Sequence, residues 1–232
     1  MKIGIMQPYF IPYIGYWQLL NAVDKYVIYD DVNYINRGWI NRNRILLNGE
    51  DKMITLSLKE ASQNKLIKEI ELVNNKKERM KILKTISQSY QKAPFYDVVY
   101  PLIEEILNFE EVNLGKFLEN SIRKIAEYLE INTTILISSE IEKDNMLKGK
   151  DKILNICKKL RATKYYNAIG GQELYSYEEF KKNGIELNFL KTSEISYIQY
   201  RNNFIPNLSI LDVMMFNSKK EIKKYLEKYE LL

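Results

Sequence analysis

Apolar residues along the chain fall into two alternating patterns. Short, continuous apolar or β-branched runs are typical of buried strands, whereas apolar residues spaced three and four apart are typical of helices. The predicted strands span residues 2–6, 25–30, 133–137, 164–169 and 185–190. The predicted helices between and after them span residues 13–22, 147–160, 176–182 and the C-terminal stretch from 218. Strands separated by helices of crossover length predict a mostly parallel sheet covered on both faces.

Two further segments interrupt this alternation. Residues 45–47 and 53–56 predict a hairpin, because Asn48-Gly49 between them readily adopts the positive φ values of a tight turn. Residues 80–90 and 114–129 have helical spacing, and Asn113 is a predicted N-cap. The predicted fold is therefore an α/β, Rossmann-like sheet flanked by helices. It carries a β-hairpin insertion at about 43–58 and a helical insertion at about 76–130.

Helix ends are also marked in the sequence. Ser176/Glu179 and Ser218/Glu221 have capping-box spacing, and Gly184 follows the first of these helices as a stop signal. These signals predict the starts of two helices in the second half of the chain.

Length and composition favour one globular domain over residues 1–232. The chain has 46% hydrophobic and 28% charged residues, which is ordinary for a packed protein. No apolar run reaches the roughly 20 residues of a membrane span, and prolines interrupt the N-terminal apolar run before it resembles a signal peptide. We expect a cytoplasmic protein, and the single Cys157 is expected to be a buried thiol rather than a nucleophile.

The chain contains no histidine. This excludes Ser-His-Asp and Cys-His catalysis and the usual zinc sites, so proton transfer is left to Asp, Glu, Lys or Tyr. The net charge of +5 is spread over mixed Lys/Glu faces, which suits anionic substrates but does not indicate duplex nucleic acid.

The first unusual segment follows the first predicted strand. Residues 7–17 contain two prolines, five aromatic residues and Gly15 at the start of a predicted helix, whose N-terminus attracts anions. We expect Phe10, Ile11, Ile14 and Trp17 to pack in the core. The polar ends of Gln7, Tyr13 and Tyr16 are candidate ligand contacts.

The second unusual segment, residues 30–44, follows the second predicted strand and is rich in Asp, Asn and Arg. The Asp30-Asp31 pair could hold magnesium, accept a proton from an amine or bind ribose hydroxyls. Arg42 and Arg44, two apart in an extended chain, could clamp a phosphate or carboxylate. The alternatives are a solvated loop and a single-stranded nucleic-acid platform around Trp39 and Tyr34.

Two weaker motifs occur later. Lys148-Gly149-Lys150-Asp151-Lys152 only partly resembles a phosphate loop. Asn167-Ala168-Ile169-Gly170-Gly171 follows a strand, and its two glycines allow a close approach of backbone. Ligands of parallel sheets bind beyond the carboxyl ends of the strands, so three of these four segments are expected at one rim.

The order of several motifs resembles the WbqC-like proteins, a bacterial family whose genes often lie among those for surface polysaccharides such as O-antigen. The matching segments are residues 6–10, 12–16, 28–32, 37–44, 92–94, 167–171 and 204–212. The resemblance implies modification of a nucleotide-linked amino sugar. Acyl or aminoacyl transfer to its amino group is the expected reaction, with ATP and Mg²⁺ as cofactors of an adenylating version.

A fainter similarity is to the nucleotidylyltransferase and pantothenate-synthetase superfamily. There the turn after the first strand carries His-x-Gly-His, and Tyr13-Ile14-Gly15-Tyr16 stands at the corresponding positions here. Tyrosine can donate a hydrogen bond but has no positive charge at neutral pH, so Arg42 or Arg44 would have to supply it.

The leading hypothesis is a transferase or ligase that acts on a nucleotide sugar without a resident metal. Its predicted catalytic residues are Asp30, Asp31 and Tyr13. The predicted substrate-binding residues are Gln7, Tyr9, Tyr16, Asn33, Arg37, Trp39, Asn41, Arg42, Arg44, Asn167, Gly170 and Gly171. A non-catalytic sugar-nucleotide-binding or scaffold protein and an aminoacyl-tRNA-dependent transferase are the alternatives.

Overall fold

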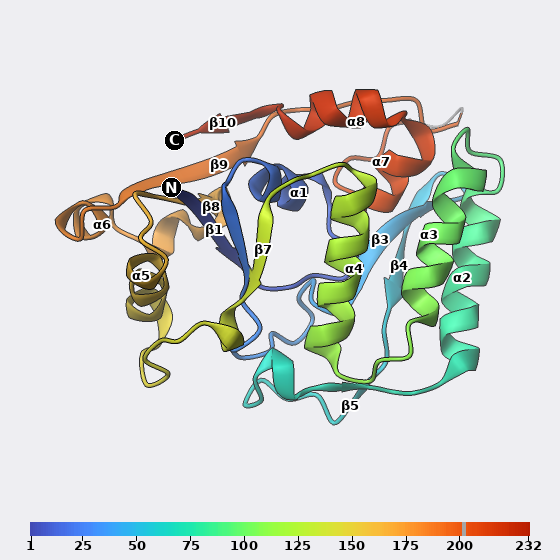
Figure 1. Ribbon diagram of the computed structural model, residues 1–232. Coiled ribbons are helices and arrows are strands. Elements are labelled where there is room, and N and C mark those ends of the chain that lie inside the picture. Colours follow the sequence, from blue (N-terminus) through green and yellow to red (C-terminus); the bar gives the residue numbers. More distant parts are fainter. Residues whose placement is uncertain (201–202) are drawn as a thin grey trace.

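A computed structural model describes residues 1–200 and 203–232. Its centre is a six-stranded sheet with helices on both faces, and the two ends of the chain lie near each other at one side of it (Figure 1). The sheet strands are β1 (Lys2–Met6), β2 (Lys25–Ile28), β7 (Thr134–Ile137), β8 (Lys164–Ala168), β9 (Glu186–Thr192) and β10 (Tyr229–Leu231).

The strand order across the sheet is β7-β2-β1-β8-β9-β10, and every neighbouring pair is parallel except β9 and β10. Counted in chain order, this is 3-2-1-4-5-6, the order of the doubly wound dinucleotide-binding sheets. The mostly parallel, Rossmann-like prediction is confirmed. The prediction of an entirely helical C-terminus is wrong, because β10 pairs with β9 through Leu232 and its neighbours.

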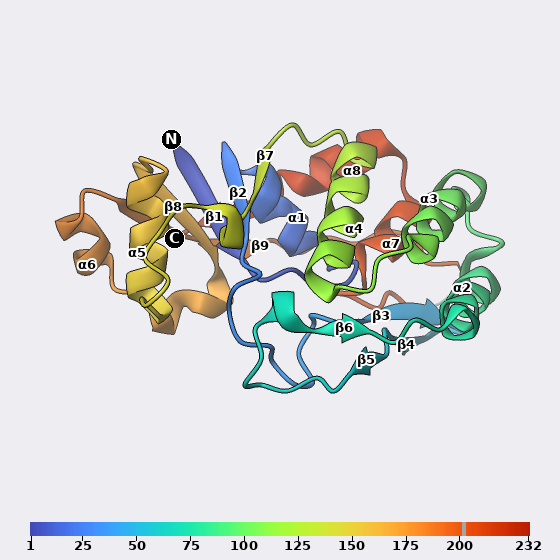
Figure 2. The same ribbon diagram turned by 60° about the horizontal axis from the view of Figure 1, so that its bottom comes forward.

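Helices cover the sheet as the crossovers require. The helices are α1 (Ile14–Asn21), α2 (Lys76–Tyr90), α3 (Tyr96–Asn108), α4 (Leu114–Tyr128), α5 (Gly149–Lys159), α6 (Tyr177–Lys182), α7 (Ile210–Phe216) and α8 (Lys219–Leu226). The short 3-10 turns are η1 (Ile67–Glu69), η2 (Ser138–Glu140) and η3 (Ile169–Leu174). One buried cluster packs α5 and α6 on one face, and a larger one packs α1, α4, α7 and α8 on the other (Figure 2).

Both predicted insertions are present. The hairpin of β3 (Arg42–Leu47) and β4 (Glu50–Thr55) turns at Asn48 and Gly49, both with positive φ. The short pair β5 (Leu58–Lys59) and β6 (Glu71–Leu72) and helices α2–α4 follow it, so that everything between β2 and β7 lies beside the sheet rather than in it (Figure 1). The sequence pattern did not resolve α3 or α7 as separate helices.

The predicted helix caps have mixed outcomes. Asn113 accepts a hydrogen bond from the Lys116 backbone, and Ser218 and Glu221 form a full capping box. Ser176, however, makes no side-chain cap, so the first predicted capping box is wrong. Gly184 ends its helix with a φ of 72°. In the described part of the chain, no helix is long and apolar enough to cross a membrane.

Candidate functional site

A charged cleft lies beyond the carboxyl ends of β2 and β7, where they face α4. Its volume is about 480 Å³, within the range of small-molecule sites. It is lined by Ile28, Asp30, Lys68, Phe109, Glu111, Asn113, Gly115, Lys116, Glu119, Asn120, Arg123, Ile137, Ser139 and Glu140. We call this cavity the rim cleft. One wall comes from the sheet, η1 and η2, and the other comes from the first turns of α4 and the segment before it.

Charged groups of both signs surround the rim cleft. Lys68, Lys116 and Arg123 supply positive charge, and the N-terminus of the 15-residue α4 adds the positive end of its dipole. The acidic groups at the cleft are Asp30, Glu111, Glu119 and Glu140. Arg123 is the most constrained of the cations, because it bonds Glu119 at 2.8 Å and the Ile135 carbonyl at the outer edge of β7.

Asp30 is the one predicted site residue that lines the rim cleft. Its carboxylate accepts two hydrogen bonds from Ser139, from the backbone N–H at 2.9 Å and from the hydroxyl at 2.6 Å. The Asp30 carbonyl also accepts the backbone N–H of Lys68. Asp30 therefore ties together β2, η1 and η2, the three elements that form the inner wall.

Asp31 does not line the rim cleft, and its carboxylate instead contacts lysines of α5 and of the segment before it. Its carboxylate binds the ammonium groups of Lys143 at 2.8 Å and Lys152 at 3.0 Å, and all three side chains are nearly inaccessible to solvent. Burial acts to raise the pKa of Asp31, but the hydrogen bonds from the two lysines outweigh it and hold the pKa below the ordinary 3.8. This buried triad, Lys143–Asp31–Lys152, was not foreseen from the sequence.

The two aspartates therefore do not form one metal site. Asp30 is bonded to a serine and Asp31 to two cations, which compete with any positive ion for its oxygens. Within residues 1–200 and 203–232, no three His, Cys, Asp or Glu side chains gather as metal ligands.

The turn after β1 is built against the start of β3. Asn43 lies buried and donates its amide hydrogens to the carbonyls of Phe10 and Ile11, at 3.0 and 2.8 Å. Ser209 also donates to the Ile11 carbonyl, at 2.7 Å, so this carbonyl accepts two hydrogen bonds. Ile11 is fully buried with a φ of 43°, a left-handed conformation that is unfavourable for a β-branched residue. Asn43, which the sequence analysis passed over, thus maintains the shape of this turn.

Most of the large side chains of the turn after β1 lie in the core. Phe10, Ile11, Ile14 and Trp17 are buried, which confirms the prediction for them. Tyr16 is also buried, packed on Tyr9 and Tyr26.

Tyr13 and Gly15 lie at the start of α1. Tyr13 is partly buried against the core, and burial raises the pKa of its hydroxyl, so it can donate a hydrogen bond but is not a base near neutral pH. A Cβ on Gly15 would lie 2.6 Å from both the Tyr13 ring and the Thr192 hydroxyl, so this position requires glycine. A smaller cleft of about 250 Å³ opens between this end of α1 and the end of β9.

Polar residues of the 30–44 segment mostly bond within the segment. Arg42 donates to the carbonyls of Gly38 and Arg37, the latter at a positive φ of 59°. Asn41 accepts from the Tyr34 hydroxyl and donates to Leu56.

Arg44, two residues further along β3, has other partners. It bonds Asp51 and the Asn207 carbonyl at 3.4 Å each and lies 5.8 Å from the centre of the half-exposed Trp39 ring. Asn33, on the other side of the loop, donates to the Gln63 carbonyl. The guanidinium groups of Arg42 and Arg44 bond different partners, and neither residue lines the rim cleft. That the two arginines clamp an anion stays a prediction.

The last predicted segment follows β8. The Asn167 side chain accepts its neighbour's backbone N–H at Ala168, and a Cβ on Gly171 would lie 2.4 Å from the Asn167 amide nitrogen. Gly170 has open space around its Cα. Gln7, at the end of β1, is partly buried. Gln7 follows β1, the strand next to β2, and residues 167–171 follow β8, which is one strand further from the rim cleft.

The residues that sequence reasoning missed are Lys68, Lys116, Arg123, Ser139 and Glu140. They lie in or beside the insertion between β2 and β7 and in the turn that follows β7. No motif marked them, because they come together only when the insertion folds against the sheet.

The fold and the cavity together define a class: an α/β protein with Rossmann strand order and a charged cleft at the rim of its sheet. The chain matches the WbqC-like protein family over residues 7–224 and belongs to that family. It is similar to the uncharacterized protein Rv1507c of Mycobacterium tuberculosis, at 27% identity over 229 residues that cover 97% of each chain. No solved structure matches it.

Proposed function

We propose that this protein binds a nucleotide-linked amino sugar in the rim cleft and transfers an acyl group to the sugar amine. The observation that carries the proposal is the presence of both charge signs in one cavity of about 480 Å³. A nucleotide-linked amino sugar also carries both signs, because its diphosphate is anionic and its amine is cationic when protonated. Family membership is consistent with this proposal.

The two charge sets suggest how the ligand lies. Lys68, Lys116 and the N-terminus of α4 suit the diphosphate, since helix N-termini and lysines both bind phosphate oxygens. Asp30 and Glu140, on the inner wall, suit the amine and neighbouring hydroxyls. This orientation would place the reacting amine against η2 and the end of β2.

Isothermal titration calorimetry with three related ligands tests the proposal. UDP-glucosamine carries the amine, UDP-glucose replaces it with a hydroxyl, and UDP lacks the sugar. We expect UDP-glucosamine to bind most tightly. Equal affinity for all three ligands would contradict recognition of an amine, and no binding of any of them would contradict the site as a whole.

Two matched variants locate the ligand. Lys116→Met should weaken all three ligands by about tenfold or more, because a hydrogen bond to a charged group contributes about 1.5–3 kcal/mol. Glu140→Gln should reduce only the preference for UDP-glucosamine. Lys220→Met is the control, since Lys220 is an exposed lysine on α8 that lies outside the cleft. Binding without any turnover in the presence of acyl donors would favour a non-catalytic sugar-nucleotide protein instead.

Activation of the acyl group by ATP is a separate prediction. It requires magnesium-dependent ATP consumption that increases when the sugar nucleotide is added. An active protein that uses a preformed ester or thioester without ATP would contradict the adenylating version but not the transfer itself.

A further inference from the structure

Ser139 lies at the inner wall of the rim cleft with its hydroxyl hydrogen-bonded to a buried carboxylate. Its Oγ donates to Asp30 Oδ2 at 2.6 Å, while its backbone N–H donates to Asp30 Oδ1 at 2.9 Å. Ser139 is exposed and lines the cavity, whereas Asp30 is 5% exposed. Ser139 thus offers its hydroxyl to the cleft, and the carboxylate of Asp30 lies directly behind it as a base.

A hydroxyl becomes a nucleophile when a neighbouring base takes its proton, and the two groups must lie within about 2.6–3.2 Å. Histidine usually fills that role, but this chain has none, so a carboxylate is the available alternative. We infer that Ser139 and Asp30 form a catalytic dyad, in which Ser139 carries the acyl group as an ester during transfer. The inference rests on the proposed function, because it assigns the chemistry of the same cleft.

The first half-reaction uses an activated acyl ester or thioester as donor. Ser139 Oγ attacks the acyl carbonyl carbon while Asp30 accepts the hydroxyl proton. The bond between carbonyl carbon and leaving group then breaks, the leaving alkoxide or thiolate takes the proton from Asp30, and an acyl-serine remains. Lys68, which comes from η1 on the same inner wall as Ser139, is available to stabilise the negative charge on the carbonyl oxygen while no sugar nucleotide is bound.

The second half-reaction returns the serine. The neutral amine of the sugar attacks the ester carbonyl carbon, and Asp30 accepts a proton from the amine nitrogen. The ester bond breaks, the proton passes to Ser139 Oγ, and an amide and the free serine are formed. No oxidant, reductant or metal enters the balance of either half.

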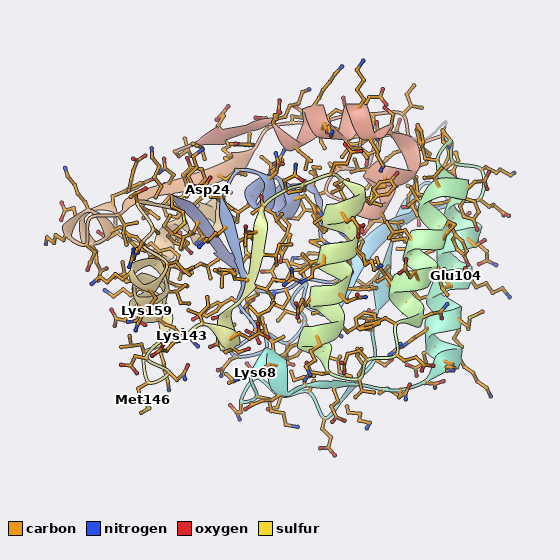
Figure 3. All side chains as sticks on the ribbon, in the orientation of Figure 1. Asp24, Lys68, Glu104, Lys143, Met146 and Lys159 are labelled. Carbon is orange, nitrogen blue, oxygen red and sulfur yellow. The ribbon has the colours of Figure 1, made fainter. Side chains whose placement is uncertain are left out.

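The surroundings hold both members in place. Lys68 donates its backbone N–H to the Asp30 carbonyl from one side, and Lys143 bonds the Ser138 carbonyl and Asp31 from the other. Figure 3 labels both lysines, Lys68 on the η1 side and Lys143 on the segment leading to α5. A catalytic pair needs this kind of support, since small misplacement of a nucleophile strongly lowers its rate.

Acylation by p-nitrophenyl acetate tests the dyad without knowledge of the natural donor. We expect a burst of one nitrophenolate per protein and an acetyl group on the peptide that contains Ser139, found by mass spectrometry. Asp30→Asn should slow the burst by roughly a hundredfold or more, the usual contribution of a general base. Ser139→Ala should abolish it, and Ser196→Ala, which removes an exposed serine outside the cleft, should leave it unchanged.

A second variant keeps the test decisive if Ser139→Ala unfolds. Ser139→Cys retains a nucleophile and should give an acetyl thioester at the same position, whereas the native Cys157 is buried and should stay unlabelled. Acetyl groups found only on lysines, or a burst that persists in a folded Ser139→Ala protein, would overturn the dyad. Calorimetry with UDP-glucosamine is independent of this acylation assay. Binding of UDP-glucosamine without acylation of Ser139 would refute the dyad alone, and acylation of Ser139 without binding of UDP-glucosamine would refute the proposed sugar-nucleotide site alone.

Discussion

The buried Lys143–Asp31–Lys152 triad gives a sharp prediction for stability. Two ammonium groups share one carboxylate oxygen, and the side chains of Lys143, Asp31 and Lys152 are 0%, 4% and 8% exposed. Asp31→Asn leaves both cations without their counter-charge inside the protein, and removal of one partner from a buried pair costs about 3–5 kcal/mol. For a chain of this length, that corresponds to a fall of roughly 6–20 °C in Tm.

The matched variant is Lys143→Met. It leaves Asp31 paired with Lys152 at equal charge. It also removes one buried ammonium together with the cost of its desolvation, which offsets part of the lost hydrogen bonding. Urea unfolding at pH 7 should therefore find Asp31→Asn clearly less stable than Lys143→Met. Equal losses, or a larger loss for Lys143→Met, would refute the reasoning that the carboxylate compensates two buried charges.

The pH dependence supplies an independent check. The pKa of Asp31 is lowered in the folded protein, so its contribution is fully present above the ordinary value of 3.8 and is lost as pH falls through the folded value. The wild type should thus lose stability below about pH 4 while Asp31→Asn loses less, and the two unfolding free energies should converge in acid. Parallel curves down to pH 3 would contradict the assignment.

Three other predictions follow from the packing. Gly15→Ala should lower the free energy of unfolding by about 1–3 kcal/mol through overpacking, which thermal unfolding would show as a lower Tm. The control Gly170→Ala, where nothing lies near the added Cβ, should leave Tm unchanged. Equal effects of the two substitutions would contradict the crowding at Gly15. Asn43→Ala should cost about 2 kcal/mol, since it removes two buried hydrogen bonds and leaves the Phe10 carbonyl without its donor, while the Ile11 carbonyl keeps Ser209; chemical denaturation checks this. Cys157, whose burial raises the thiol pKa to about 12, should react with iodoacetamide only after unfolding; rapid labelling of the native protein would contradict its burial.

Much of the fold could be predicted from the sequence because its signals are local. The strand runs, the Asn48-Gly49 turn and the Asn113 cap depend on neighbouring residues, and the structure contains all of them. The strand β10 could not be predicted this way, since its three residues become a strand only by pairing with β9. The prediction of a capping box at Ser176 was wrong for another reason: a capping sequence permits the hydrogen bond but does not require it.

The site was only partly predictable. The rule that ligands bind beyond the carboxyl ends of parallel strands predicted a site at this edge of the sheet, and Asp30 lines the cavity that opens there. The rule could not show that Asp30 and Asp31 separate, since adjacent carboxylates form one cluster in the sequence, whereas in the structure Asp30 bonds Ser139 and Asp31 bonds two lysines. The partners of Asp31 are more than a hundred residues away. Lys152 ends the weak phosphate-loop-like motif that begins at Lys148, but nothing in that motif indicated a pairing with Asp31.

The arrangement also explains why the most conspicuous motifs do not form the walls of the rim cleft. Asn43, Gly15 and Ile11 are committed to shaping the turn after β1, which occupies the central position where strand order reverses. The cleft opens instead at the β2/β7 end, where the long insertion returns to the sheet and α4 closes over it. On the proposed function, chemical specificity would depend on what the insertion brings to that edge, because the polar groups of the rim itself are Asp30 and the turn that carries Ser139. Exchange of the α4 charges should therefore change which ligand binds, while exchange of the turn residues should change whether the protein folds.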